Sequence, residues 1–381
     1  MRKVMTIVGT RPELIKMSAV IGRLDRLTEH VLVHTGQNYD YALNQVFFDD
    51  LGIRKPDHFL EVAGSKAVET ISNVILKVDG ILEAEQPEAV LIYGDTNSGL
   101  AVIAAKRRKI PVFHMEAGNR CFDQRVPEEL NRKVIDHLSD VNMTLTEHAR
   151  RYLLAEGLPP ETTFVVGSHM EEVLALHAER IRASSILARL ALTPGNYFIV
   201  SAHREENVDD TERLSALLDC LDRLATTHRK PVIVSTHPRT KNRMDALAGH
   251  RSRRRDSNDL VRFLDPFGFT DYIHLQQHAA CVLSDSGTIT EEASLLNFPA
   301  VTMRESHERP EGMDAGTLIM CALNPDRLLD AVRCATDQQG HQRRFAGSVQ
   351  DYKGGDVSAK VVKIVLSYID YINNRVWHKP N

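Results

Sequence analysis

Short apolar runs alternate with amphipathic segments along almost the whole chain, and this alternation limits the possible folds more than any other feature. Each run has the length of a β-strand, and the segments between the runs repeat apolar residues at helical spacing. In segment 11–27, for example, Leu14, Met17, Ile21 and Leu24 would lie on one face of a helix. A repeated strand–helix–strand pattern predicts an α/β fold with parallel sheets.

The predicted strands fall into two series, which indicates two doubly wound domains. We expect the first domain at 1–170 and the second at 171–357, with a helix at 358–381 that packs back. One charged helix, MEEVLALHAERIRASSILARL, is expected next to the boundary. The first series reads VMTIVGT, HVLVHTG, AVLIYGD, PVFHMEAG, VNMTLTE and TFVVGS, and the second reads YFIVSAHR, PVIVSTHP, VRFLDP, ACVLSDS and PAVTMR.

Charge and composition exclude several classes of protein. The chain has 381 residues with 47 basic and 51 acidic side chains, so it lacks the basic surface of a dedicated nucleic-acid binder. Its apolar runs are far shorter than the roughly 20 residues that span a bilayer, and the first predicted strand begins almost at Met1. We therefore expect no nucleic acid, no membrane and no signal peptide. The cysteines form no CxxC pair, which favours a reducing cytoplasm: Cys121, Cys220, Cys281, Cys321 and Cys334.

Polar residues follow the predicted strands directly. In open parallel sheets ligands bind beyond the carboxyl ends of the strands, so these residues predict a site in a cleft between the two domains. Taken singly, each has a plain explanation as a turn residue or a solvated charge. The segments are Gly9-Thr10-Arg11-Pro12-Glu13, Gly94-Asp95-Thr96-Asn97, Glu116-Ala117-Gly118-Asn119-Arg120, His203-Arg204-Glu205-Glu206, His237-Pro238-Arg239 and Asp285-Ser286-Gly287.

The segment 283–311 has the residues needed to bind a nucleotide diphosphate. Its small-residue turn precedes a helix, and Thr288 with Glu291 fits a capping box at the helix start. A helix N-terminus offers free N–H donors and a positive dipole end, so a pyrophosphate would lie on Ser286 and Gly287. Glu292 would then bind a ribose diol. The alternative is that these residues only cap the helix.

Several ordered motifs resemble the non-hydrolysing UDP-N-acetylglucosamine 2-epimerase family over essentially the whole chain. The stretches MEAGNRCFDQRVPEE and HTGQNYDYALNQVFFDDL further resemble the branch that forms UDP-N-acetyl-L-fucosamine for capsule or O-antigen. The resemblance implies an isomerase with two Rossmann-like domains of the glycosyltransferase-B type, UDP bound mainly by the second domain, no metal or nicotinamide cofactor, and a homodimer. The motifs are GTRPE, YGDTNS, HMEAGNR, VPEELNRK, SAHREEN, STHPR, DPFGFTDY and SDSGTITEEAS with ERPE.

The resemblance also implies roles for single residues. Asp95, Glu116, Glu128 and His203 match the catalytic residues of the family. The bland alternatives are that Asp95 caps a helix, that Glu128 is simply an acid favoured in a first helical turn, and that His203 is structural.

Further residues match substrate contacts of the family. Phe267 is expected to stack on uracil, although a packed core phenylalanine is an equally good interpretation, and Arg11 has the alternative of an ordinary surface charge. His237 follows a predicted strand and is expected at the same site. The binding residues implied by the motifs are Arg11, Lys16, Arg132, His237, Phe267, Ser286, Gly287, Glu292 and Arg309.

The absence of two cofactor-binding motifs bears on the reaction that the resemblance implies. C2 of a 2-acetamido sugar has no adjacent carbonyl, and the chain has neither GxGxxG nor a Walker A motif, so transient oxidation is poorly supported. Elimination of UDP to a 2-acetamidoglycal, followed by re-addition, is the simple route. The expected substrate is UDP-2-acetamido-2,6-dideoxy-L-talose, and UDP-N-acetylglucosamine is the alternative. A hydrolysing epimerase, a UDP-sugar-dependent glycosyltransferase and a UDP-sugar-binding regulator are more distant alternatives.

Overall fold

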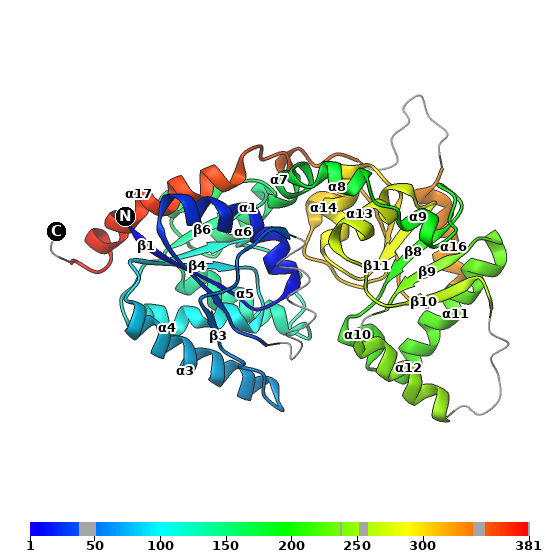
Figure 1. The fold of residues 1–381 in the computed structure, drawn as a ribbon, viewed down its shortest axis with the longest axis horizontal. Helices are drawn as coiled ribbons and strands as arrows, with labels where there is room; N and C mark the ends of the chain where they lie inside the picture. Colours follow the sequence, from blue (N-terminus) through cyan, green and yellow to red (C-terminus); the bar gives the residue numbers. More distant parts are fainter. Residues whose placement is uncertain (38–50, 237, 251–257, 338–346, 380–381) are drawn as a thin grey trace. The chain divides into compact units, whose positions relative to one another are not determined.

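The computed structural model describes residues 1–37, 51–236, 238–250, 258–337 and 347–379, and the chain divides into two compact units (Figure 1). Unit 1 comprises Met1–Leu176 and Asp351–Asn381, and unit 2 comprises His177–Gln350. The chain therefore enters the second unit after Leu176 and leaves it after Gln350, whereas the second domain was expected at 171–357. The last helix, α17 (Val357–Arg375), belongs to unit 1 and contacts α1 (Arg11–Leu27) there.

Unit 1 is built on a seven-stranded sheet with the order β3-β2-β1-β4-β5-β6-β7, and its strand pairs are parallel. Each expected strand of the first series is present. An additional edge strand, β3, is only two residues long, too short for a periodic sequence signal. The strands are β1 (Lys3–Val8), β2 (Glu29–His34), β3 (His58–Phe59), β4 (Ala89–Tyr93), β5 (Val112–Met115), β6 (Val141–Thr144) and β7 (Thr163–Val165).

Helices cover both faces of this sheet (Figure 1). On one face α3, α4 and α5 bury an apolar cluster that includes Met5, Ile7, Val74 and Ile135, while α1 and α17 lie on the other face. The remaining elements follow the same strand–helix alternation. They are α3 (Ala67–Glu85), the short 3-10 helix η1 (Asn97–Ala101), α4 (Val102–Arg107), α5 (Pro127–Leu138), α6 (Glu147–Ala155), η2 (Pro160–Thr162), α7 (His169–Leu176) and η3 (Gln350–Tyr352).

Unit 2 has a six-stranded parallel sheet with the order β10-β9-β8-β11-β12-β13. One apolar cluster lies between the sheet and helices α11 and α16, and another lies on the opposite face with α9, α13 and α14. The strands are β8 (Phe198–Ser201), β9 (Val232–Ser235), β10 (Val261–Leu264), β11 (Cys281–Ser284), β12 (Ala300–Thr302) and β13 (Ile319–Met320). The helices are α8 (Ala178–Arg182), α9 (Ile186–Arg189), α10 (Glu205–Val208), α11 (Thr211–His228), α12 (Pro238–His250), α13 (Phe269–His278), α14 (Thr288–Leu296), α15 (Pro310–Asp314) and α16 (Pro325–Ala335).

The single charged helix expected at 170–190 is wrong, because the segment forms α7, α8 and α9 in succession. The backbone leaves helical geometry at His177, whose ring packs edge-on against Phe269 with 5.6 Å between centroids. It does so again at Ser185, next to Ser184, whose hydroxyl donates to Asp271 and accepts from the backbone N–H of Ile186. A serine side chain that bonds nearby backbone competes with helix continuation.

Both sheets reverse their strand order at one point, and these two points locate the candidate site. The order reverses between β1 and β4 in unit 1, and between β8 and β11 in unit 2. Loops on either side of such a reversal run to opposite faces of the sheet and leave room for a ligand beyond the strand ends. The expectation of two doubly wound, Rossmann-like domains is confirmed by this topology.

Candidate active site

A buried carboxylate, Glu13, closes the reversal point of unit 1. One oxygen of Glu13 accepts from the backbone N–H of Gly9 at 2.5 Å and of Thr10 at 3.0 Å, and the other accepts from the Thr96 hydroxyl at 2.6 Å. Burial raises the pKa of the Glu13 carboxyl to about 7, against the hydrogen bonds from Thr96, Gly9 and Thr10. Glu13 thus joins the turn after β1 to the turn after β4, which carries Asp95. Its position in GTRPE marked it in the sequence, but its role is one of holding the turns.

Glu116 is the carboxylate whose surroundings are most specific. It follows β5 directly and has φ of 63°, in the left-handed region that a non-glycine residue adopts only at a cost. Lys16 Nζ lies 2.7 Å from Glu116 Oε2, the Tyr93 hydroxyl donates to the same oxygen, and Asn119 Nδ2 donates to Oε1 at 3.2 Å. The Lys16 and Glu116 side chains are 5% and 12% exposed, so this pair is largely shielded from water. The structure therefore brings together two predicted residues that are far apart in the sequence.

Asp95 and Arg132 form the second predicted pair. Arg132 Nε donates to Asp95 Oδ2 at 2.8 Å, and Arg132 Nη1 donates to Glu129 Oε2 at 2.9 Å. Burial raises the pKa of the Glu129 carboxyl, but hydrogen bonds from the Cys121 backbone and the charge of Arg132 outweigh it and hold that pKa below its usual value. The Asp95 side chain keeps 28% of its surface exposed, whereas Arg132 keeps 3%. Glu129 thus holds the guanidinium of Arg132 in place, and Arg132 in turn holds the carboxylate of Asp95.

Arg11 and Glu128 occupy the first turns of helices at the same end of the sheet. Arg11 is the first residue of α1 and Glu128 the second residue of α5, and both are half-buried. An acidic residue is favoured in a first helical turn by the helix dipole, so position alone does not separate a catalytic role for Glu128 from a capping role. Both residues nevertheless lie beyond the carboxyl ends of the strands.

In unit 2 a fully buried carboxylate, Asp285, organises the reversal point. Its oxygens accept from the backbone N–H of His203 at 3.0 Å and of Arg204 at 3.0 Å, and from Asn207 Nδ2 at 3.1 Å. The His203 ring, 43% exposed, has Nδ1 3.4 Å from Asp285 Oδ1. Asp285 therefore fixes both the backbone and the ring side of the predicted catalytic histidine. The sequence places Asp285 in the turn after the strand, but no pattern in it predicts this role.

The predicted capping box at the start of α14 is wrong. The N-cap is Gly287 rather than Thr288, and Glu291 pairs with Arg309 Nη2 at 2.9 Å instead of turning back to the helix start. The Ser286 hydroxyl lies 3.0 Å from the Thr288 hydroxyl and accepts weakly from the Thr288 N–H at 3.4 Å.

Gly287 packs closely against a neighbouring carboxylate, and its backbone angle is an ordinary one. A Cβ at Gly287 would lie 2.2 Å from Glu308 Oε1, so any larger residue must displace that carboxylate. Glu308 in turn accepts from Arg304 Nη1 at 2.8 Å. This packing holds the N-terminus of α14 against a buried ion pair.

Arg304 is a candidate binding residue that the sequence analysis missed. Its side chain is 1% exposed, and among the residues that the structure describes its Nε and Nη2 atoms have no hydrogen-bond partner. Arg304 Nη1 lies 3.9 Å from the position of a Cβ on Gly287, at the N-terminus of α14. A buried guanidinium with spare donors beside a helix N-terminus suits an anion. The available signal was its position at the end of the apolar run PAVTMR, two residues after β12.

The other predicted ligands of unit 2 are paired within the protein. Glu292 accepts from Gln276 Nε2 at 2.6 Å and is buried, and Arg309 is buried against Glu291. Phe267 is partly buried and packs against the apolar cluster of α9, α13 and α14, which favours the packed-core interpretation. His237, also predicted to bind substrate, lies outside the described residues.

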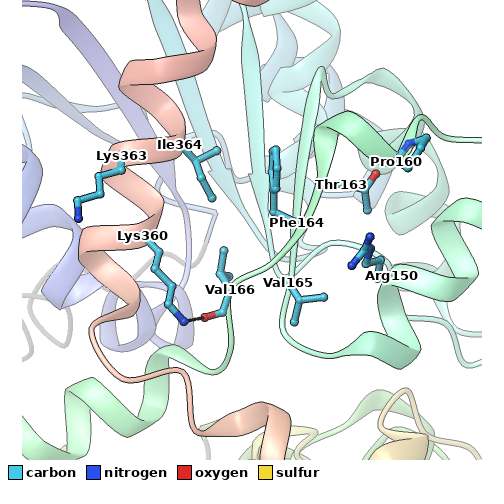
Figure 2. Close-up of a pocket in the computed structure, with 9 residues that line it drawn as sticks. All are labelled: Arg150, Pro160, Thr163, Phe164, Val165, Val166, Lys360, Lys363 and Ile364. Atoms are coloured by element: carbon cyan, nitrogen blue, oxygen red, sulfur yellow. Dashed lines mark hydrogen bonds between the residues drawn. The ribbon is translucent and has the colours of Figure 1, made fainter.

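Unit 1 also has an open pocket at the edge of its sheet, between β7 and α17 (Figure 2). Its volume is about 530 Å³, and Lys360 Nζ donates across it to the Val166 carbonyl at 3.3 Å. Its lining combines basic and apolar side chains but includes no carboxylate and none of the predicted site residues. We therefore assign no part of the site to it. The lining residues are Arg150, Pro160, Thr163, Phe164, Val165, Val166, Lys360, Lys363 and Ile364.

Across residues 1–37, 51–236, 238–250, 258–337 and 347–379, no three His, Cys, Asp or Glu side chains are grouped so as to hold a metal ion. Over the same ranges, no helix combines the length and the apolar character that crossing a membrane requires.

Comparison with known proteins decides the family. The profile described as UDP-N-acetylglucosamine 2-epimerase matches residues 23–366. The chain belongs to this family. The UDP-N-acetylglucosamine 2-epimerase of Methanococcus maripaludis is 33% identical over 367 residues, which cover 95% of this chain and 98% of that protein.

Solved structures of family members agree with the fold. The UDP-N-acetylglucosamine 2-epimerase from Rickettsia bellii is 58% identical with a TM-score of 0.91, and the match covers 100% of both chains. The Methanocaldococcus jannaschii enzyme, solved in complex with UDP-GlcNAc and UDP, is 30% identical with a TM-score of 0.88 over 96% of this chain and 99% of that chain. The family predicted from the motifs is thus confirmed.

Proposed function

We propose that this member of the UDP-N-acetylglucosamine 2-epimerase family inverts C2 of a UDP-2-acetamido sugar. The observation that carries the assignment is the fixed carboxylate pair at the carboxyl ends of β4 and β5, with Asp95 held by Arg132 and Glu116 held by Lys16. Carboxylates that are locked in place suit the two tasks that the reaction sets at a sugar ring, which are proton transfer at C2 and stabilisation of a positive ring carbon.

The proposed reaction proceeds by elimination and re-addition. A base removes the C2 proton while the bond from C1 to the UDP oxygen breaks, which gives a 2-acetamidoglycal and UDP. A proton then adds to C2 from the opposite face, and one of the equivalent β-phosphate oxygens of UDP re-forms the bond to C1. No redox partner is needed, because the atoms and electrons balance without one.

We assign the roles as follows. Asp95 and Glu128 transfer the C2 protons, Glu116 supports the positive charge that develops on the ring carbon, and His203 interacts with the leaving diphosphate. The clustering of basic donors and a helix N-terminus in unit 2 supports UDP binding by that unit, through Ser286, Gly287 and further residues of the α14 region. Preorganised donors aimed at a leaving anion stabilise the transition state without reorganisation.

We also propose which UDP-2-acetamido sugar is the substrate. The stretch MEAGNRCFDQRVPEE resembles the branch that acts on UDP-2-acetamido-2,6-dideoxy-L-talose, and we propose this sugar as the substrate. The second stretch that carries this resemblance, HTGQNYDYALNQVFFDDL, falls largely on residues outside the described part of the chain. UDP-N-acetylglucosamine is the second candidate, and the names of the relatives support it. A role in capsule or O-antigen synthesis goes with the first candidate.

One incubation separates the candidates and the more distant alternatives. The protein is mixed with each UDP-sugar, without acceptor, in separate samples, and the products are followed by proton NMR. We expect inversion at C2 with the UDP-sugar otherwise intact, and faster turnover of the 6-deoxy-L-talo compound. Free sugar with UDP would indicate a hydrolysing epimerase, and the absence of turnover with both compounds would contradict the proposed function and leave a transferase or a binding protein.

Two further expectations accompany this function. We propose a homodimer, since closed two-fold assemblies are the commonest oligomers. We also propose a cytoplasmic location, which the free thiols of the five cysteines support: Cys121, Cys220, Cys281, Cys321 and Cys334. Light scattering of the purified protein and fractionation of cells test these two points.

A further inference from the structure

Behind the carboxylates of unit 1 lies a buried charged network that the proposed reaction does not use. His114 Nδ1 is 2.8 Å from Asp136 Oδ1, and Arg120 Nη1 donates to Asp136 Oδ2 at 2.6 Å. The side chains of His114, Asp136 and Arg120 are 1%, 0% and 0% exposed. Arg120 also donates to both oxygens of Glu156, at 2.8 and 2.7 Å. Burying the charged pair of Arg120 and Asp136 is costly, so the arrangement calls for an explanation.

The network connects the two turns that carry the candidate catalytic carboxylates. His114 Nε2 donates to the carbonyl of Gly94, the residue before Asp95, at 2.7 Å. Asp136 accepts from the N–H of Gly118, two residues after Glu116, at 3.2 Å to each oxygen. A continuous path of hydrogen bonds therefore runs from the Asp95 turn through His114 and Asp136 to the Glu116 turn.

Both turns contain residues with positive φ, and one of these residues, Glu116, is not a glycine. The φ values are 66° at Gly94, 63° at Glu116 and 82° at Gly118, all in the left-handed region. A Cβ on Gly118 would lie 2.5 Å from the carbonyl oxygen of Ala149, so glycine is also required there by close approach. Glycine adopts such angles freely, but the conformation of Glu116 persists only where surrounding contacts hold it.

Helix α5 presents the residues that reach both turns. Glu128, Arg132 and Asp136 follow one another at i, i+4 and i+8 and so lie along one face of the helix. Arg132 binds the Asp95 side chain directly, and Asp136 binds the Glu116 turn. The helix thus holds the two turns at a fixed separation.

The hydrogen-bond pattern also fixes where protons lie. The Gly94 carbonyl is only an acceptor, so His114 Nε2 carries a proton. Nδ1 faces a carboxylate oxygen, so the contact of His114 with Asp136 holds one further proton between them. With Arg120 and Glu156 the cluster then contains two cations and two anions if that proton is on the ring. His137, which contacts Glu156 Oε2 at 2.9 Å, is the further titratable group beside this cluster.

We propose that His114 and Asp136 are positioning residues that set the separation between the carboxylates of Asp95 and Glu116. This inference rests on the proposed function, because the separation matters only if the two carboxylates act on one sugar ring. Displacing a reacting group by about 1 Å costs on the order of 10²-fold in rate. UDP affinity does not depend on this separation.

Two substitutions of His114 separate the two links. In His114→Gln the side-chain amide nitrogen lies near the position of Nε2 and keeps the bond to Gly94, while the bond to Asp136 is lost. In His114→Asn the amide lies near the position of Nδ1 and keeps the bond to Asp136, while the bond to Gly94 is lost. If the bridge needs both links, each variant lowers kcat by about 10²-fold and leaves KM unchanged.

Asp140→Asn is the matched control. Asp140 is also a buried carboxylate, 3% exposed, and it binds Lys106 Nζ at 2.6 Å and the N–H of Val112 at 2.9 Å. Val112 begins β5, so this pair lies at the end of the strand remote from Glu116. We expect Asp140→Asn to lower the melting temperature and to leave kcat per folded molecule unchanged. The folded fraction of every variant is measured by UDP titration.

A second measurement on the unchanged protein covers the case in which the His114 variants do not fold. In proton and nitrogen NMR of histidine-labelled protein we expect both ring protons of His114 to exchange slowly with water. Ring protons in fast exchange overturn the bridge, as does wild-type kcat in either folded His114 variant. If the unchanged protein inverts neither UDP-sugar, the proposed function fails, and the ring-proton measurement still decides whether the bridge exists.

Discussion

At the residue scale, the contact between Lys16 and Glu116 is expected to affect both the stability of the protein and its kcat. Lys16→Met keeps the length of the side chain but leaves Glu116 as a largely buried carboxylate without its cation. Breaking such a pair typically costs about 3–5 kcal/mol of stability, and we expect kcat to fall by about 10²-fold or more. Kinetics with the UDP-sugar and urea unfolding check both effects.

The double variant Lys16→Met/Glu116→Gln is the control for that experiment. It also removes the carboxylate charge that Lys16 offsets in the unchanged protein, so stability is expected to recover while activity stays low. A Lys16→Met protein with the kcat of the unchanged enzyme would contradict the role given to this pair.

Arg304 gives a second prediction at the residue scale. Its unused donors beside the N-terminus of α14 are expected to bind the diphosphate. A hydrogen bond to a charged group contributes about 1.5–3 kcal/mol, so Arg304→Gln is expected to raise the Kd for UDP by about 10- to 100-fold. Calorimetry measures this Kd. Arg213→Gln, which removes a more exposed pair with Glu305, serves as the control, and equal effects in both variants would exclude Arg304 from the site.

At the scale of elements, Glu13 couples the start of α1 to the turn after β4, and this coupling has a predictable pH dependence. The pKa of Glu13 is raised to about 7, so between the ordinary carboxylate value near 4.5 and pH 7 the folded protein holds a proton that the unfolded chain has released. Stability from this group is therefore present at the acidic end of that range and decreases as pH rises through it.

We test the coupling with Glu13→Gln, which does not titrate. The stability of the unchanged protein, measured by urea unfolding, is expected to fall between pH 5 and pH 7 relative to that of Glu13→Gln, by about 1.4 kcal/mol for each pH unit within the range. The exposed Glu161→Gln variant should follow the unchanged protein. Parallel pH profiles for Glu13→Gln and the unchanged protein would show that Glu13 titrates normally.

The elements of the fold were largely predictable because their signals are local. Each strand expected from an apolar run is present, and the helix expected at 11–27 is α1. Strands β3 and β13, two residues each, have no periodicity to detect, and the break at His177 depends on packing against Phe269, which no local pattern records.

The site was less predictable, because its contacts join distant parts of the chain. Residue types beyond the strand ends indicated Asp95, Glu116 and His203, but the contact of Lys16 with Glu116 spans 100 residues of sequence. Asp285 and Arg304 are buried. A sequence does not show which charged side chains point into the protein interior.

At the scale of the whole molecule, the two units carry different kinds of candidate site residues. Unit 1 supplies fixed carboxylates at its reversal point, and unit 2 supplies a histidine, buried arginines and the N-terminus of α14. Under the proposed function, unit 1 acts on the sugar and unit 2 holds the leaving group. A substitution in unit 1 such as Asp95→Asn is therefore expected to lower kcat by about 10²- to 10⁴-fold while the Kd for UDP stays unchanged. Kinetics and UDP calorimetry on the same preparation check this division of roles.

Positional isotope exchange tests the central claim, reversible cleavage of the bond between C1 and UDP, most directly. The UDP-sugar carries ¹⁸O in the oxygen that bridges C1 and the β-phosphorus, and the reaction runs in deuterated water. We predict that ¹⁸O moves to non-bridging positions of the β-phosphate while deuterium enters C2. Inversion of C2 in which all the ¹⁸O stays in the bridge would contradict elimination and re-addition.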